Sequence, residues 1–176
     1  MTAPLRILGI DPGSRRCGYG VVDVAHRPLG LRYVECGVIQ ATLTAPFATR
    51  LAEIAAGLRE IIAELAPAEF AIESVFLHEN VQSALLLGQA RGVALLCAAE
   101  AGLPIHEYTP ARVKKAVAGK GRAAKRQVQE MVRALMGLKR LPAADAADAL
   151  AIAICHAYAA AAPPVGALPA AQGGRA

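Results

Sequence analysis

Three strand-like segments follow one another in the first forty residues of this chain, and this order restricts the possible fold more than any other feature. Apolar or alternating runs cover residues 5–10, 19–24 and 31–40. The turn signals between them are Asp11-Pro12-Gly13 and Arg27-Pro28. Consecutive strands joined by short turns pair antiparallel. The sequence therefore predicts a sheet with an antiparallel start.

Helical and strand-like segments alternate through the rest of the chain. Their apolar spacing predicts, in order, a helix at 47–65, a strand at 69–75, a helix at 80–101, a strand at 105–108, and helices at 109–118, 123–136 and 142–162. An antiparallel start followed by alternating helices and strands predicts an α/β fold, with a mixed sheet and helices on both of its faces.

The chain has the size of one domain. Residues 1–162 carry the periodic segments, whereas residues 163–176 are Pro, Gly and Ala without periodicity, which predicts a disordered tail.

The cysteines form no C-x-x-C pair, which favours reduced thiols over a disulfide framework or a cysteine zinc site; they are Cys17, Cys36, Cys97 and Cys155. The apolar stretch 149–162 is shorter than the ~20 residues of a spanning helix, and no signal peptide precedes the first strand. We therefore expect a cytoplasmic protein without a membrane segment.

The segment 80–101 is unusually apolar. Leu85, Gly88, Gly92 and Leu95 mark one face of the predicted helix, and further apolar residues cover its other faces. A helix that is apolar nearly all round is covered on more than one side. Either this helix is central to the core or a second subunit covers it.

Four acidic residues occupy unusual places in the pattern. Asp11 ends the first strand, and Glu73 follows the apolar residues 70–72. Asp145 and Asp148 lie three apart, so they share one face of the last predicted helix. Taken singly, the four could be a turn residue, a strand-end charge and a pair that offsets the helix dipole. Taken together, they offer the oxygen ligands that Mg²⁺ prefers, and two such ions about 4 Å apart can clamp a phosphodiester during hydrolysis.

Most of the net charge of +5 lies in one stretch. Between Glu107 and Glu130 the sequence contains no acidic residue, but it does contain the basic residues Arg112, Lys114, Lys115, Lys120, Arg122, Lys125 and Arg126. Such a concentration indicates either a solvated helix face or a surface for a polyanion.

Four strings of the sequence resemble, in order and at similar spacing, the RuvC crossover junction endodeoxyribonucleases, which are bacterial Holliday junction resolvases. The strings are GIDPGSRRCGYGVVD (9–23), FAIESVF (70–76), SALLLGQARG (83–92) and DAADALAIAI (145–154), and the likeness covers about residues 5–158. The resemblance implies a ribonuclease-H-like fold, in which a five-stranded mixed sheet is flanked by helices on both faces.

The resemblance also implies the chemistry. It assigns both catalysis and metal binding to Asp11, Glu73, Asp145 and Asp148, which would hold two Mg²⁺ ions, with Mn²⁺ as a substitute. The implied reaction is paired, symmetric nicking of four-way (Holliday) DNA junctions during homologous recombination and repair, leaving 5′-phosphate and 3′-hydroxyl ends. The four histidines are scattered along the chain, and we expect them to be structural or at the surface.

Other residues match DNA contacts of the family. Phe76 resembles an aromatic wedge at the junction crossover, although the residue alone, followed by Leu77, is more typical of a core phenylalanine. Lys114 and Lys125 resemble residues that hold the scissile backbone, and the rest of the basic run would contact phosphates generally. Aromatic residues are scarce and tryptophan is absent, which favours recognition of duplex arms and junction shape over stacking along single strands.

The expected partners follow from the substrate. A four-way junction has near two-fold symmetry and needs two nicks, so we expect a C2 homodimer with residues 80–101 at its interface. The family also implies a branch-migration motor of the RuvA and RuvB type.

Two other functions fit parts of the sequence. The string GIDPGS also resembles the phosphate loop of actin-like ATPases and sugar kinases, but those proteins duplicate the fold and need a second phosphate loop that the sequence lacks. A junction-binding scaffold without catalysis would explain the basic run and leave the carboxylates unexplained.

Overall fold

One mixed sheet forms the centre of the protein. Its strands are β1 (Leu5–Asp11), β2 (Arg16–His26), β3 (Leu29–Gln40), β4 (Glu69–Glu73) and β5 (Ile105–Tyr108), in the spatial order β3-β2-β1-β4-β5. The pairs β1–β2 and β2–β3 are antiparallel, and the pairs β1–β4 and β4–β5 are parallel. The computed structural model describes residues 4–26, 29–74 and 81–161, and the predicted tail at 163–176 lies outside them. The predicted antiparallel start and mixed five-stranded sheet are confirmed.

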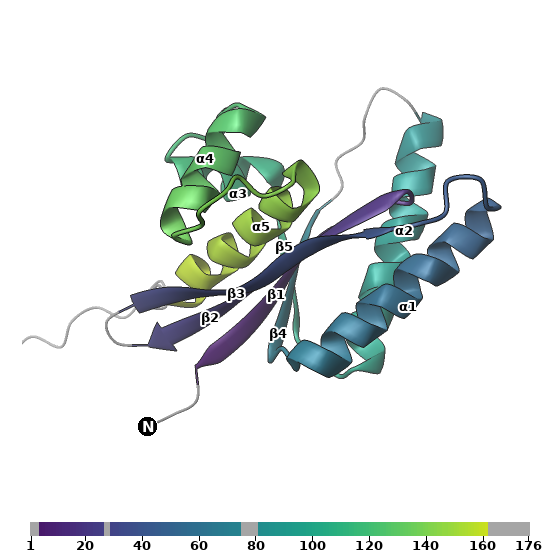
Figure 1. Cartoon of the computed structure of the whole chain (residues 1–176), viewed down its shortest axis with the longest axis horizontal. Helices are drawn as coiled ribbons and strands as arrows, with labels where there is room; N and C mark the ends of the chain where they lie inside the picture. Colours follow the sequence, from purple (N-terminus) through teal and green to yellow (C-terminus); the bar gives the residue numbers. More distant parts are fainter. Residues whose placement is uncertain (1–3, 27–28, 75–80, 162–176) are drawn as a thin grey trace, which may run out of the picture.

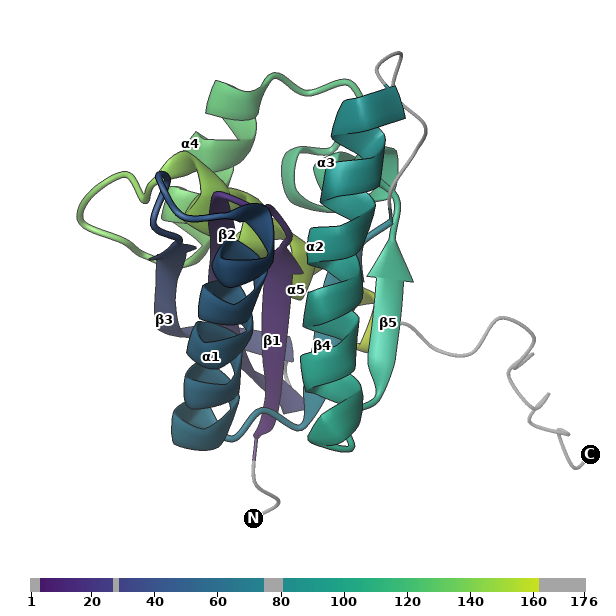
Figure 2. The ribbon, with the colours of Figure 1, turned by 90° about the vertical axis from the view of Figure 1, so that its right-hand side faces the viewer.

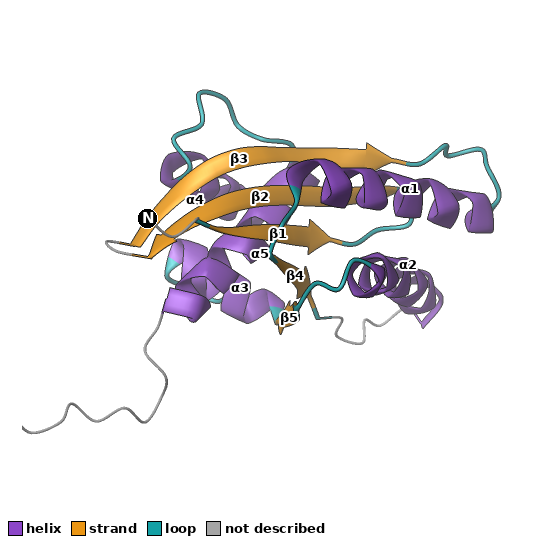
Figure 3. Ribbon diagram, turned by 90° about the horizontal axis from the view of Figure 1, so that it is seen from below, coloured by secondary structure: helices purple, strands orange, loops and turns teal. Residues whose placement is uncertain are grey.

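Helices cover both faces of this sheet. The described helices are α1 (Phe47–Leu65), α2 (Val81–Glu100), α3 (Pro110–Ala118), α4 (Lys125–Leu135) and α5 (Ala144–Ala161). Helices α1 and α2 lie side by side on one face, and α3, α4 and α5 cover the other (Figures 1, 2 and 3). The last helix begins two residues later than predicted, because the carbonyl of Pro142 accepts a hydrogen bond from Gln129 Nε2 of α4 at 2.9 Å. The α/β fold with helices on both faces is confirmed.

The core has two halves that share β1. Because side chains alternate along a strand, Leu8 and Ile10 pack with α1 and α2, whereas Ile7 packs with α5. The four cysteines are free, as predicted. Because β1 packs against helices on both of its faces, its position in the core is well defined, and so is the position of Asp11 at its end.

Helix α5 lies very close to the sheet because both surfaces carry small residues. A Cβ atom on Gly9 would lie 2.3 Å from the carbonyl oxygen of Ala149, and one on Gly18 would lie 2.1 Å from that of Asp145. The alanine-rich sequence of α5 is the other half of this contact, and the helix is buried from Ala149 to Ala157. Small residues on both sides therefore bring the start of α5 directly onto β1 and β2.

Two helices, α2 and α5, are long and apolar enough to cross a membrane by length and composition. The core helix of a soluble protein passes the same test, and α5 is mostly buried between the sheet and its neighbouring helices. Helix α2 differs, because it buries Ala90, Ala94, Cys97 and Ala98 and leaves its opposite face open. The alternative that α2 is central to the core of this chain is therefore wrong.

Candidate active site

Two acidic residues meet where β1 and β4 end. The strands are parallel neighbours with Ile10 opposite Ile72, so Asp11 and Glu73 follow at the same edge of the sheet. Ile10 and Ile72 belong to the α1–α2 half of the core. Because side chains alternate, Asp11 and Glu73 both face α5. Parallel strand ends are also where ligands bind in open α/β sheets.

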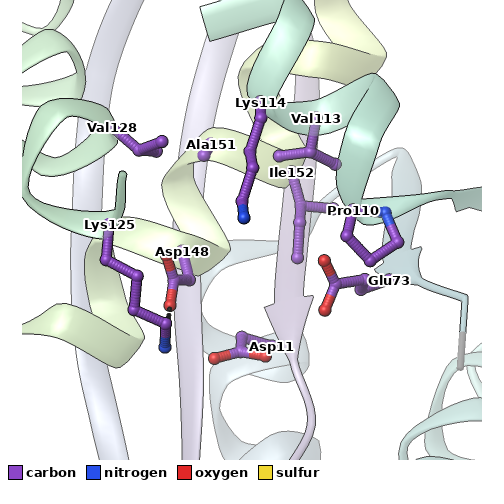
Figure 4. A pocket seen from close by; sticks show the side chains of 10 residues that line it. All are labelled: Asp11, Glu73, Pro110, Val113, Lys114, Lys125, Val128, Asp148, Ala151 and Ile152. Atoms are coloured by element: carbon purple, nitrogen blue, oxygen red, sulfur yellow. Dashed lines mark hydrogen bonds and ion pairs between the residues drawn. The ribbon is translucent and has the colours of Figure 1, made fainter. Parts of the chain in front are cut away.

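Helix α5 adds Asp148 to this pair. Its carboxylate and those of Asp11 and Glu73 point toward one another across a shared space (Figure 4). The close packing of Ala149 on Gly9 sets this arrangement, because Asp148 directly precedes Ala149. The sequence therefore uses small residues on the sheet to bring a helix carboxylate to the strand ends.

These carboxylates line a pocket of about 240 Å³. Its walls come from β1, β4, α3, α4 and α5, and its lining residues are Asp11, Glu73, Pro110, Val113, Lys114, Lys125, Val128, Asp148, Ala151 and Ile152. Two lysines face three carboxylates over an apolar floor. Such a pocket combines oxygen ligands for a cation with ammonium groups for a phosphate.

Asp145 lies beside this pocket and does not line it. Its Oδ2 atom forms an ion pair with Nε of Arg16 at 2.7 Å. Its charge nevertheless raises the pKa of Asp11, so the fourth carboxylate belongs to the same electrostatic cluster. The structure thus brings all four predicted acids to one edge of the sheet, three of them into the pocket.

The pocket carries excess negative charge. Burial raises the pKa of Asp11 to about 7, and the charges of Asp148, Glu73 and Asp145 add to this effect, in that order. Lys125 opposes it from α4, where Nζ lies 3.4 Å from Asp148 Oδ2, and this contact raises the pKa of Lys125. A divalent cation would neutralise the remaining charge, and a set of carboxylate oxygens fits Mg²⁺.

The basic run divides into two groups. Lys114 and Lys125 line the pocket. Arg112 lies over the ring of Tyr108 at 4.9 Å, and Arg126 forms an ion pair with Glu130. Lys115, Lys120 and Arg122 are also exposed and do not line the pocket. The run is therefore a basic surface next to the carboxylates, and only two of its members reach them.

Two arginines contact residues of the site in a way that the sequence did not predict, and one predicted aromatic residue cannot be compared with the structure. Arg91 of α2 donates from Nε to the carbonyl oxygen of Glu73 at 3.2 Å and lies 2.5 Å from the carboxylate of Glu107. Arg16 holds Asp145. Neither contact has a signal in residue spacing, because both join segments far apart in the chain. Phe76 lies outside the described residues.

The chain matches known proteins over most of its length. The family model described as crossover junction endodeoxyribonuclease RuvC matches residues 7–156. The crossover junction endodeoxyribonuclease RuvC of Halorhodospira halophila is 56% identical over 153 residues, which cover 87% of this chain and 90% of that protein. The same enzyme from Burkholderia multivorans is 54% identical over 154 residues, or 88% and 84% of the two chains.

A solved structure has the same fold. Thermus thermophilus RuvC in complex with a Holliday junction substrate superposes with a TM-score of 0.82 and is 38% identical, covering 89% of this chain and 95% of that one.

Proposed function

The chain belongs to the family of crossover junction endodeoxyribonucleases RuvC, and from this premise we propose that its carboxylate pocket cuts four-way (Holliday) DNA junctions. The reaction is phosphodiester hydrolysis by paired symmetric nicks, in homologous recombination and DNA repair, and it places the enzyme with the DNA in the bacterial cytoplasm. The observation that carries the proposal is the meeting of Asp11, Glu73 and Asp148 in one pocket with two lysines. A scaffold without catalysis would not need this arrangement.

We propose that the four carboxylates hold two Mg²⁺ ions, with Mn²⁺ as a substitute. Bound ions of this kind supply Lewis-acid stabilisation of the phosphoryl charge and a water of lowered pKa. Asp11 must lose its proton before it can act as a ligand. Lys114 and Lys125 bind phosphate oxygens, and the apolar floor formed by Val113 and Ile152 limits the access of other water molecules.

A cleavage assay tests this function. The protein is incubated with a synthetic mobile four-way junction in the presence of Mg²⁺ or of a chelator. We expect paired nicks with 5′-phosphate and 3′-hydroxyl ends, and only when the metal is present. Junctions that stay intact under every metal condition would refute the nuclease, and ATP turnover would support the kinase-like alternative.

The lysines of the pocket give a prediction about salt dependence. Each lysine that binds a phosphate contributes about 0.9 to the slope of log K against log salt concentration. We expect Lys114→Ala to lower this slope by about 1 and to weaken junction binding, measured by fluorescence anisotropy at several salt concentrations in chelator. Lys139, which is exposed between α4 and α5, provides the control. A slope that changes equally in Lys114→Ala and Lys139→Ala would contradict a phosphate contact in the pocket.

The open face of α2 supports a homodimer. Val81, Leu85 and Leu96 are exposed by 70%, 56% and 54%. Gly88 and Gly92 lie one turn apart between them, and a Cβ atom on either would meet no atom within 4 Å. Glycines in this position let another helix approach closely. A second copy of the chain fits this face, because a two-fold symmetric dimer presents two pockets to two symmetric strands.

A charge on this open face should separate the dimer. We expect Leu85→Glu to weaken dimerisation at least about thirtyfold, because a buried hot spot contributes 2 kcal/mol or more and an unpaired charge there is costly. Analytical ultracentrifugation measures the association, and the junction assay should then show single nicks in place of paired ones. Leu43→Glu is the matched control, since Leu43 is 60% exposed outside α2. A wild-type monomer that still makes paired nicks would exclude the dimer.

Two further parts of the proposal come from the family resemblance. Phe76 would act as the wedge at the crossover, where stacking on a base is worth ~1–3 kcal/mol. A branch-migration motor of the RuvA and RuvB type would be the protein partner.

A further inference from the structure

A second group of metal-ligand side chains lies under the C-terminal half of α5. The histidines are scattered along the chain, but His106 and His156 meet in the fold, where their rings stack with centroids 4.1 Å apart. Both meet Glu69, and the three residues offer ligand atoms that all lie within 4.8 Å of one another. Glu69 begins β4, His106 lies in β5 and His156 in α5.

This group is separate from the carboxylate pocket. Glu69 and Glu73 are at opposite ends of β4, which places them about 13 Å apart along the strand. His156 and Asp148 are eight residues apart in α5, which corresponds to about 12 Å. None of the three residues lines the carboxylate pocket. A ligand bound at one site therefore leaves the other free.

We propose that Glu69, His106 and His156 bind a single transition-metal ion, for which Zn²⁺ is the natural choice. Two imidazole nitrogens and one carboxylate oxygen suit Zn²⁺ better than Mg²⁺, which prefers oxygen alone. Nε2 of His106 lies 3.6 Å from Oε2 of Glu69, and Nε2 of His156 contacts the same oxygen. The three donor atoms therefore lie close together, and a water molecule would fill the fourth position around a bound ion.

The local environment of both histidines favours metal binding. His156 is buried, and this burial lowers its pKa, which favours the neutral ring that can bind a metal ion. Its Nδ1 atom lies 2.6 Å from Oη of Tyr108, and a ligand histidine commonly makes such a hydrogen bond from its other nitrogen. Nε2 of His106 is buried and, within the described part of the chain, has no hydrogen-bond partner. A metal would satisfy this atom.

Binding requires a small local change. Donors around a tetrahedral ion lie roughly 3.3 Å apart at ligand distances of about 2 Å. Nε2 of His106 must therefore move slightly closer to Glu69, Nε2 of His156 must move away from the Glu69 oxygen that it contacts, and the His106 ring must turn out of its stack. The side chain of His106 is 39% exposed and has room to turn, whereas His156 is fixed in the core. The bound ion would join β4, β5 and α5, three elements that are distant in the sequence, and would stabilise this end of the fold.

Cobalt absorption tests the site directly. Co²⁺ is titrated into the full-length protein in excess Mg²⁺, which occupies the carboxylate pocket. Tetrahedral Co²⁺ has strong visible bands, whereas Co²⁺ surrounded by six oxygens absorbs weakly. We expect a strong band that saturates at one ion per chain. Glu69→Gln and His106→Phe should each weaken binding at least about tenfold, and Glu60→Gln, an exposed change on α1, should not.

Thermal unfolding gives a second readout that is independent of nuclease activity. At a hundredfold excess over its Kd, Zn²⁺ should raise the Tm of the wild-type protein by about 5–10 °C and leave that of His106→Phe unchanged. A wild-type protein without a saturable cobalt band would overturn the proposal. So would a band that persists in both variants, because it would arise from other ligands.

Discussion

We expect Asp148→Asn to lower the rate of junction cleavage by about a thousandfold while junction binding stays within a few fold of wild type. An amide removes the charge that holds a metal ion, and stabilisation of the phosphoryl charge is worth several kcal/mol. Since 1.36 kcal/mol is a factor of ten in rate, the loss of about 4 kcal/mol gives this figure. Binding survives because it depends on the basic residues around the pocket.

The measurement is single-turnover cleavage of a labelled junction at saturating enzyme, beside anisotropy binding in chelator. Glu64→Gln, an exposed change on α1, is the control and should cleave as wild type does. Asp11→Asn should behave as Asp148→Asn does. Asp145→Asn should lose less activity, because Asp145 is held by Arg16 beside the pocket. Full activity in Asp148→Asn would exclude the pocket as the catalytic centre.

Most of the fold could be predicted from the sequence because each element carries a strong local signal. The three strands in a row, the spacing in α1 and the short strands β4 and β5 all give periodic patterns. The start of α5 was less predictable, since Pro142 is typical of a first helical turn and is instead held by Gln129. Local signals place elements well and place their ends less well.

The active site was predictable only as a set of candidates. Periodicity shows that Asp11 and Glu73 end strands, but the register that places them at one edge arises from pairing between distant segments. The family resemblance supplied the grouping. The different places of Asp148 and Asp145 depend on Arg16, and the meeting of His106 with His156 depends on the packing of α5 on β5. Such contacts are non-local and leave no pattern in a single sequence.

Removing the charge of Asp11 should stabilise the metal-free protein while abolishing its activity. The pKa of Asp11 is raised from 3.8 to about 7, chiefly by burial, so the folded state keeps a proton that the unfolded state has released. The stability of the wild type therefore falls as the pH rises from about 4 to 7. A shift of this size corresponds to at most about 4 kcal/mol, and partial exposure reduces it. Asparagine has no charge and avoids the loss.

Thermal unfolding in chelator at two pH values measures this effect. At pH 8 the Tm of Asp11→Asn should exceed that of the wild type by about 5 °C or more, and near pH 4 the two should nearly coincide, because the unfolded chain then gains little from ionising Asp11. Mg²⁺ should raise the Tm of the wild type and have little effect on the variant. Asp145→Asn loses its ion pair with Arg16 and should show no gain in Tm. This variant therefore tests whether the gain in Asp11→Asn comes from the burial of Asp11 or only from removing one negative charge from the cluster. Equal Tm values for Asp11→Asn and wild type at pH 8 would mean that burial and the neighbouring carboxylates do not disfavour the charged form of Asp11.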